Sequence, residues 1–150
     1  MTAETFAPFG VVLEPPAVPG RTQRLPLPAN LRPEAVPTMT LIHLERGTAS
    51  RQIDRMERHR HAGQAFLHLG GGALLVVVAA TDADGGPDLT KVTAFRTTPG
   101  QGFAYHPDIW HAGVSALDEP ARVASLLCCD DSADDVEELV LHTASLIALW

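Results

Sequence analysis

One segment of consecutive apolar residues, Ala73–Ala80, constrains the fold more than any other part of this chain. It is rich in β-branched valine and lies between a triple glycine and a polar turn at residues 82–88. A short apolar run without alternating polar residues is typical of a strand that is buried on both faces. The rest of the chain must therefore supply packing partners for both sides of this strand.

The remaining segments up to residue 129 indicate further short strands. Twelve glycines and twelve prolines supply frequent turns, which favour strands over a helical bundle. The Pro-rich stretch from Pro15 to Pro37 predicts an irregular wrap or an edge, because proline cannot donate to a β-ladder. We therefore expect a mainly β fold, a sandwich or barrel. An entry loop and a short strand are expected within 6–13, and further strands are expected at 39–44, 50–61, 64–69, 73–80, 92–97, 103–106, 111–116 and 121–129.

The tail after residue 131 has a different pattern. Apolar or small residues recur there at helical spacing, at Val136, Leu139, Val140, Thr143, Ala144 and Ile147. Ser132 and the aspartates behind it can cap a helix. The pattern therefore predicts a short C-terminal helix, with a final strand over Leu139–Leu141 as the alternative. The apolar stripe of such a helix would pack on its own sheet or on a second subunit.

Size, charge and cysteine usage limit the class of protein. The length of 150 residues predicts one domain, with an N-terminal wrap and edge strands at 1–50, a barrel core at 51–130 and a tail at 131–150. A net charge of −7 argues against a nucleic-acid partner. The apolar runs are too short to span a membrane, and no leader is visible, so we expect a cytoplasmic protein. The adjacent Cys128 and Cys129 are expected to be reduced thiols in a strand.

Histidines gather in two short runs that are about fifty residues apart, at His59, His61, His106 and His111. Side chains alternate along a strand, so His59 and His61 would share one face with Glu57. Arg55 has the same parity as Glu57, whereas Arg58 should point outward. A later histidine on a second strand would then close a metal site or an acid/base site. The alternative is that these are solvated surface histidines.

The spacings within the two runs are similar to the two motifs of the cupin superfamily. His59-x-His61 is followed by Gln64, which stands where the first motif has its acidic ligand. The spacing of the second motif is kept by Gly100, His106, Asp108 and His111. The resemblance implies a small jelly-roll β-barrel with its site inside. A metal there would have three imidazoles, from His59, His61 and His111, and the amide of Gln64. This set suits Ni, Mn, Fe or Zn.

A longer ordered set of strings resembles the ureidoglycolate lyase family. The strings include Glu57-Arg58-His59, Gln64-Ala65-Phe66, Pro87-Asp88-Leu89, Gln101-Gly102, Tyr105-His106 and Trp110-His111. The resemblance implies a carbon–nitrogen lyase that cleaves (S)-ureidoglycolate into glyoxylate and urea in allantoin and purine catabolism. It also implies a homodimer and a small anionic substrate. His61, His68 and Ala112 depart from the family pattern, which leaves the exact substrate open.

Such a reaction needs a base for the hydroxyl proton, an acid for the leaving nitrogen and a cationic partner for the carboxylate. We expect Glu57 to be the base, with a structural ion pair to an arginine as the alternative. His59 and His111 are expected to bind a metal or transfer protons, and His61 is a ligand if metal binds. Gln64 is the fourth candidate catalytic residue and can donate to the substrate carboxylate or the urea carbonyl, with a packing role as the alternative. The other candidate substrate-binding residues are Arg55, Phe66, His68, Tyr105 and His106.

Two other functions fit the same residues. One is a different metal-dependent cupin enzyme, such as a dioxygenase or an isomerase, acting on a small carboxylate. The other is a cupin that binds a ligand without catalysis. A metal is not strictly required for the lyase reaction either, because acid/base groups alone can move both protons.

Overall fold

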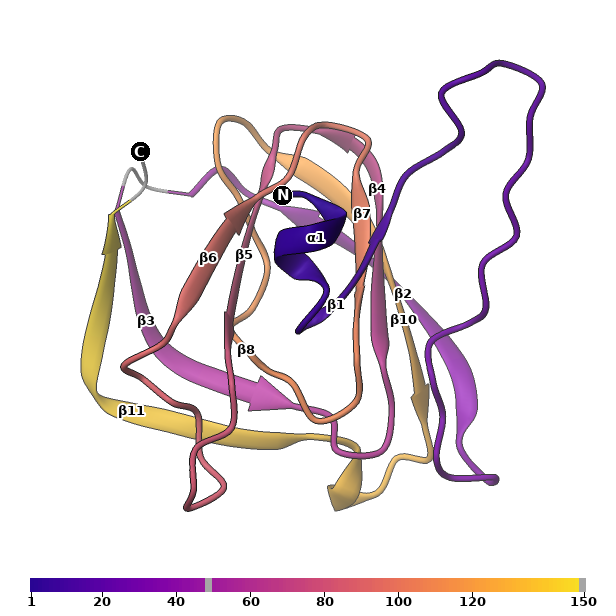
Figure 1. The fold of residues 1–150 in the computed structure, drawn as a ribbon. Coiled ribbons are helices and arrows are strands. Elements are labelled where there is room, and N and C mark those ends of the chain that lie inside the picture. The colour runs from indigo at the N-terminus through magenta and orange to yellow at the C-terminus, as the bar shows by residue number, and fades with distance from the viewer. Residues whose placement is uncertain (48–49, 149–150) are drawn as a thin grey trace.

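The computed structural model describes residues 1–47 and 50–148 and consists mainly of two antiparallel sheets that face each other (Figure 1). One sheet has the order β1-β7-β4-β10-β2, and the other has the order β11-β3-β8-β5-β6, with β9 paired to β5. The strands are β1 (Gly10–Leu13), β2 (Val36–Leu44), β3 (Ser50–Arg58), β4 (Gln64–Gly71), β5 (Leu74–Ala79), β6 (Thr93–Arg96), β7 (Gly102–Tyr105), β8 (Trp110–His111), β9 (Ser115–Ala116), β10 (Ala121–Cys129) and β11 (Glu137–Ala148). This architecture confirms the expected mainly β fold.

Strand β5 is buried on both faces, as its apolar run predicts. Leu74, Val76 and Val78 pack between the two sheets with aromatic residues of β4 and β7. Leu75 and Val77 pack on the other face of their own sheet, against a second cluster that includes Trp110. Because neighbouring side chains enter different clusters, a polar residue anywhere in this strand would be buried without water.

A short helix that the sequence did not predict, α1 (Ala3–Phe6), lies between the two sheets (Figure 1). Thr2 caps it by accepting a hydrogen bond from the Thr5 main-chain nitrogen at 3.2 Å. Phe6 is fully buried and meets Phe95 and Phe103 edge to face, with ring centroids 5.3 and 5.9 Å apart. The helix therefore fills one end of the barrel interior with aromatic side chains.

The Pro-rich wrap is irregular, as expected. Residues 14–35, all of which the structure describes, form no extended strand and project from the barrel before returning to it (Figure 1). On its return the wrap pairs with a loop that follows β3, since the Leu31 nitrogen donates to the His61 carbonyl at 2.8 Å. Pro37 lies in β2, which is an edge strand of its sheet.

The predicted C-terminal helix is wrong, and the alternative of a final strand is confirmed. Ser132 does act as a cap, but only for the 3₁₀ turn Ala133–Asp135. The chain then enters β11, which pairs with β3 from Glu137↔Arg58 onward. Hydrogen bonding along the free edge of β3 overrides the weak helical pattern. The side chains beyond Leu141, including the predicted stripe positions Thr143, Ala144 and Ile147, lie outside the described part.

Two simpler expectations can also be compared with the structure. Cys128 and Cys129 lie in β10 and are free thiols with respect to the described residues, as predicted. Within residues 1–47 and 50–148, no helix has the length and apolar character that crossing a membrane requires.

Candidate active site

Glu57, His59 and His111 converge between the sheets. Their candidate ligand atoms all lie within 4.8 Å of one another. Strand pairing creates this convergence: Glu57 of β3 is directly opposite His111 of β8, and His111 is opposite Val78 of β5. Residues that are directly opposite each other point to the same face of a sheet. These two side chains therefore share the face on which Val78 packs into the interior.

The two imidazoles are oriented in the same way by main-chain carbonyls. Nδ1 of His59 lies 2.6 Å from the Asp135 carbonyl oxygen, and Nδ1 of His111 lies 2.8 Å from that of Ile109. A carbonyl only accepts, so each Nδ1 carries a proton and donates it. Each Nε2 is buried, and neither has a hydrogen-bond partner among the residues that the structure describes. A ring fixed at Nδ1 by a main-chain carbonyl, with Nε2 left for a ligand, is typical of histidines that bind metals or move protons.

Glu57 and His111 form the closest contact between side chains in this group. The His111 Nε2 lies 3.3 Å from the Glu57 Oε1. Because Nδ1 of His111 already donates to Ile109, this contact is attractive when Nε2 also carries a proton or when a cation lies between the two atoms. The pair is therefore suited either to proton transfer or to cation binding.

The surroundings shift the pKa values of three groups. The close contact with His111 lowers the pKa of Glu57 against the opposing effect of burial, and nearby His59 and Arg55 lower it further. Burial lowers the pKa of His59, although its bond to the Asp135 carbonyl partly opposes this. Burial and the charge of Glu57 raise the pKa of Tyr105. Near neutral pH, the site thus holds a carboxylate, a neutral imidazole and a phenol.

Tyr105 and Gln64 add two further polar atoms to this end of the barrel. The Tyr105 ring stacks on His111 with centroids 4.3 Å apart. Its Oη and the Oε1 of Gln64 are buried and lack a partner within the described chain. The other end of the amide is fixed, because Nε2 of Gln64 donates to the Ser125 Oγ at 3.1 Å. Several buried polar atoms without partners in one place indicate a ligand site.

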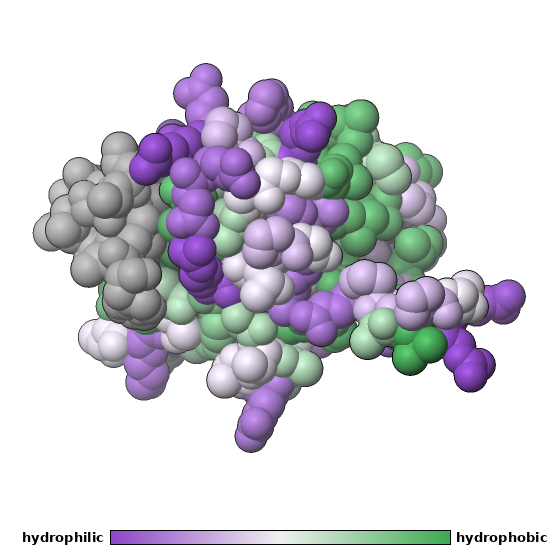
Figure 2. Space-filling model, turned by 90° about the horizontal axis from the view of Figure 1, so that it is seen from above, coloured by the Kyte–Doolittle hydropathy of each residue, from purple (hydrophilic) through white to green (hydrophobic). Residues whose placement is uncertain are grey.

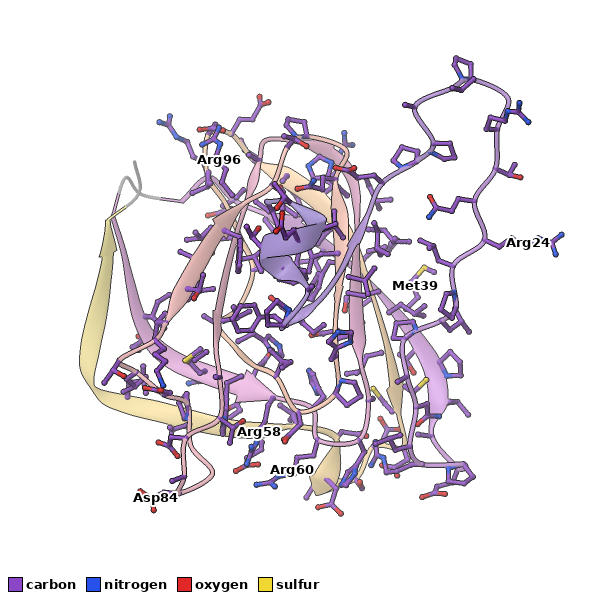
Figure 3. All side chains as sticks on the ribbon, viewed as in Figure 1. Arg24, Met39, Arg58, Arg60, Asp84 and Arg96 are labelled. Atoms are coloured by element: carbon purple, nitrogen blue, oxygen red, sulfur yellow. The ribbon has the colours of Figure 1, made fainter. Side chains whose placement is uncertain are left out.

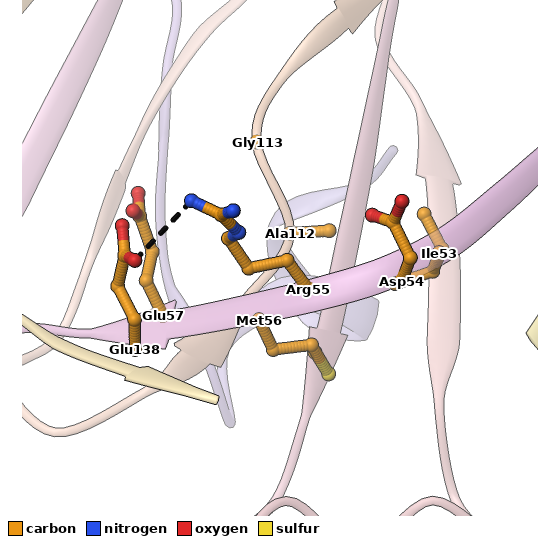
Figure 4. A pocket seen from close by; sticks show the side chains of 8 residues that line it. All are labelled: Ile53, Asp54, Arg55, Met56, Glu57, Ala112, Gly113 and Glu138. Carbon is orange, nitrogen blue, oxygen red and sulfur yellow. Dashed lines mark hydrogen bonds and ion pairs between the residues drawn. The ribbon is translucent and has the colours of Figure 1, made fainter. Parts of the chain in front are cut away.

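A cleft of about 350 Å³ leads from the surface to Glu57 (Figure 4). Arg55 lies at its mouth, and the Arg55 Nη1 is 3.2 Å from the Glu138 Oε2. Figure 4 shows the guanidinium beside the neighbouring carboxylates of Glu138 and Glu57, on the side that faces both. Arg55 and Glu57 are two residues apart in β3, as their expected shared parity requires, and this places an exposed cation beside the candidate base.

His61 does not join the group, because β3 ends at Arg58. The expectation that His59 and His61 share one strand face is therefore wrong. The chain turns after Arg58, and the His61 carbonyl is held by the wrap. The His61 side chain lines a different hollow, together with Arg60 and Asp134.

Three other candidate residues lie away from the triad. Phe66 is in the aromatic core and stacks on Phe103 with centroids 5.2 Å apart. His68 contacts main-chain atoms through both ring nitrogens, at 2.9 Å to the Gly72 carbonyl and at 3.1 Å from the Gly100 nitrogen. His106 is exposed beyond the end of β7. The structure therefore brings Glu57, His59 and His111 together and places these three elsewhere.

Arg58 leaves the barrel interior as expected, yet it is buried, with 1% of its surface exposed. Its guanidinium lies 4.5 Å from the centroid of the Trp110 ring. It also pairs with Asp108 at 3.1 Å and with Glu137 at 2.9 Å. Arg58 thus joins the chain segments that carry His59 and His111.

Asp108 supports the site through its backbone, and its position in the second cupin motif was visible in the sequence. The second cupin motif has a glycine at this position, and Asp108 has a φ of 68° in the left-handed region, which favours glycine and tolerates aspartate. Its main-chain nitrogen donates to the His59 carbonyl at 2.8 Å. The turn at Asp108 therefore ties the run with His111 to the backbone of His59.

The fold is that of cupin-like jelly-roll proteins. The structure is similar to a 3,4-ketoisomerase from Helicobacter canadensis, with a TM-score of 0.54 and 14% identity over 85% of this chain and 89% of the other. It is also similar to a dTDP sugar isomerase from Desulfovibrio desulfuricans G20, with a TM-score of 0.52 and 18% identity over 90% of this chain and 84% of the other. At these identities the likeness concerns the fold alone.

The chain belongs to the ureidoglycolate lyase family, whose family model matches residues 1–148. It is 38% identical over 128 residues to the ureidoglycolate lyase of Brucella abortus, covering 79% of this chain and 74% of that protein. It is 34% identical over 132 residues to the ureidoglycolate lyase of Rhodobacter capsulatus, covering 83% of this chain and 80% of that protein. The resemblance seen in the sequence is thereby confirmed.

Proposed function

We propose that this protein cleaves (S)-ureidoglycolate into glyoxylate and urea, as a step of allantoin and purine catabolism. The observation that carries the proposal is the convergence of Glu57, His59 and His111 in a chain of this family. The unpartnered buried atoms around the triad support a small polar ligand there, since such atoms rarely stay unsatisfied in a native protein.

The reaction breaks a carbon–nitrogen bond and forms the aldehyde carbonyl of glyoxylate. Glu57 takes the proton of the substrate hydroxyl group, which is attached to the carbinolamine carbon. The C–O bond of that carbon then becomes the double bond of the aldehyde. The bonding electrons of the C–N bond leave with the urea nitrogen, which needs a proton. His111, 3.3 Å from Glu57, is placed to pass a proton from the carboxylate side to that nitrogen. Such positioned acid/base groups typically contribute about 10²–10⁴-fold.

The other polar residues offer contacts to the two ends of the substrate. Arg55 at the mouth of the cleft is the candidate partner of the substrate carboxylate, which would compete with Glu138 for it. The Oε1 of Gln64 can accept from a urea N–H, and the Oη of Tyr105 can donate to a substrate oxygen. We assign packing roles to Phe66 and His68, because their rings are already engaged within the barrel.

The triad also fits a divalent metal. Two Nε2 lone pairs and a carboxylate oxygen, each within 4.8 Å of the others, form a donor set that suits Zn, Ni, Mn or Fe. Glu57, His59 and His111 would hold the ion, with the Oε1 of Gln64 as a fourth candidate. A bound ion would make the substrate hydroxyl more acidic. The main-chain bonds at both Nδ1 atoms keep the imidazoles in the tautomer that such binding needs.

A coupled assay of glyoxylate release from (S)-ureidoglycolate, run with and without a chelator, tests the proposal. Loss of release with the chelator and recovery with one divalent ion would support the metal-dependent form. Release that the chelator does not change would support acid/base catalysis without a metal. If no release occurs under any metal condition, the lyase proposal is overturned in favour of another cupin enzyme or a binding protein.

We also propose that the protein is a homodimer that pairs through the outer face of the β1-β7-β4-β10-β2 sheet. An apolar row crosses all five strands in register, through Val11, Ala104, Ala65, Leu126 and Met39. Leu41 is 73% exposed and Leu69 is 56% exposed on the same sheet. Figure 2 shows hydrophobic residues gathered on this side, and in Figure 3 Met39 points away from the barrel. Exposed apolar faces of this kind mark interaction sites.

Light scattering after size exclusion tests the dimer. The variant Leu41→Glu should become a monomer, because it places a charge in the proposed interface. Leu89→Glu is a matched control, since Leu89 is also exposed, at 45%, but follows the polar turn before β6. A dimer that survives Leu41→Glu would exclude this face as the interface.

A further inference from the structure

The N-terminal wrap contacts the active-site end of the barrel through one mostly buried arginine, Arg32. Its side chain is 12% exposed and binds two carboxylates at once. The Arg32 Nη1 lies 3.0 Å from both oxygens of Asp130 and 3.2 Å from the Ser132 Oγ. The Arg32 Nη2 binds the Asp135 carboxylate. The sequence pattern indicated only a helix cap for Ser132 and the aspartates after it, and no role for Arg32 or Asp130.

Asp135 is the residue through which this cluster reaches the triad. Its carboxylate binds Arg32 and accepts hydrogen bonds of 3.2 Å from the Asp130 main-chain nitrogen. Its main-chain carbonyl accepts from the Nδ1 of His59 at 2.6 Å. Asp135 is therefore held by Arg32 through its carboxylate and by His59 through its main-chain carbonyl. A shift of the turn that carries Asp135 would move the partner of the His59 ring.

The same wrap also holds the backbone next to His59. The Leu31 nitrogen donates to the His61 carbonyl at 2.8 Å, and the Gly63 nitrogen donates to the Ala29 carbonyl at 2.8 Å. Gly63 must be a glycine, because a Cβ there would lie 2.7 Å from the Tyr105 carbonyl oxygen and 3.3 Å from the Ala29 nitrogen of the wrap. The wrap therefore anchors both the loop that carries His59 and the residue that orients its ring.

We propose that Arg32 is a positioning residue for the active site: by fixing Asp135, it holds the ring of His59 with Nε2 directed toward Glu57 and His111. Without the guanidinium, the Asp130 and Asp135 carboxylates would face each other unpaired and partly buried, and their repulsion would open the turn. The His59 ring would then lose its carbonyl partner and populate both tautomers. The importance of this orientation for turnover rests on the proposed function, whereas the orientation itself does not.

Nitrogen-15 NMR of the imidazoles in metal-free protein, at a pH of about 8 where histidines are neutral, tests the orientation directly. The wild type should show His59 as a single Nδ1–H tautomer. Arg32→Met should show a mixture, and Arg32→Lys an intermediate result, since lysine keeps the charge but not the planar fork. This readout needs no substrate, so it stays informative if the lyase proposal fails.

The matched control is Arg96→Met. Arg96 also pairs with an aspartate, Asp118, at 2.5 Å, but it lies at the opposite end of the barrel from Arg58 and Arg60 (Figure 3). Arg32→Met should lower kcat by about 10–100-fold relative to this control, as losses of outer-shell partners typically do, with little change in KM. If Arg32→Met fails to fold, Asp135→Asn replaces it, because it removes the ion pair and keeps the carbonyl. A wild-type tautomer of His59, with a kcat equal to that of the control, would overturn the proposal.

Discussion

The two ends of the barrel interior are built from the same strands but hold opposite kinds of surroundings. At the end that α1 closes, Phe6 and Phe103 pack edge to face, and His68 has both ring nitrogens satisfied by main-chain groups. At the other end, His59 and His111 each have one satisfied nitrogen and one buried nitrogen without a partner in the described chain. Both ends contain a histidine, so a histidine alone does not distinguish them. The functional end is marked by ring nitrogens that have no hydrogen-bond partner within the described chain.

Breaking the closed end should have the largest effect, and the effect should be on stability. Phe6→Ala should lower the free energy of unfolding by about 3–5 kcal/mol, because it empties a fully buried ring site. Urea denaturation measures this loss, and turnover per folded molecule should change little. Leu89→Ala, at a position that is 45% exposed and outside the proposed dimer face, should cost much less. Equal losses in the two variants would contradict the assignment of Phe6 to the core.

Breaking the open end should affect turnover while the fold is retained. Glu57→Gln and His111→Ala should each lower turnover by at least about 100-fold, or roughly 2.7 kcal/mol in transition-state stabilisation. Steady-state glyoxylate release, with circular dichroism as the check on folding, measures the effect. His43→Ala, an exposed histidine on β2, should behave as wild type. Near-normal turnover in either site variant would remove that residue from the mechanism.

His68 sharpens the comparison, because it is a histidine at the closed end. His68→Ala leaves the Gly72 carbonyl and the Gly100 nitrogen without their side-chain partner. We expect a loss of stability of about 1–2 kcal/mol and a kcat close to that of the wild type. Thermal denaturation and kinetics on the same sample measure both quantities. A large fall in kcat with unchanged stability would instead give His68 a functional role.

The smallest expected effect concerns pH and the ion pairs beside the open end. Arg60 and Arg58 lower the pKa of Glu137 from 4.5 to about 2. A lowered carboxyl pKa stabilises the fold above the unfolded value and loses this contribution as the pH falls from about 4.5 toward about 2. Glu137→Gln should therefore be less stable than wild type at pH 7, and the difference should shrink by about pH 3. A difference that does not depend on pH would exclude the charge as its cause.

Much of the fold follows from local patterns in the sequence. The burial of β5 on both faces and the irregular wrap were predictable, because apolar continuity and proline each limit the backbone directly. The C-terminal strand was predicted only as the alternative to a helix, since a free edge on β3 decides its structure and no local pattern records that edge. The end of β3 at Arg58 was missed for a related reason: the turn there depends on the wrap, which returns to pair with the His61 carbonyl.

The candidate site was predictable only in part. Glu57, His59 and His111 carry a motif, and the structure brings them together. Arg32 and Asp135 carry none, because their effect on His59 passes through a main-chain carbonyl, and any residue type has one. Asp108 was predictable in part. It occupies a glycine position of the second cupin motif, and its φ of 68° shows why the motif favours glycine there.

The anchoring of His59 also has a consequence for the order of folding. Its ring partner Asp135 is 76 residues away in sequence, and Arg32 is 103 residues from Asp135. Contacts across such distances require the closure of long loops, which makes them slow to form. The hairpins of the sheets can form before the wrap at Arg32 and the turn at Asp135 meet beside His59. During refolding, the circular dichroism of the sheets should therefore recover earlier than enzyme activity, and the active site should be among the last parts of the molecule to form.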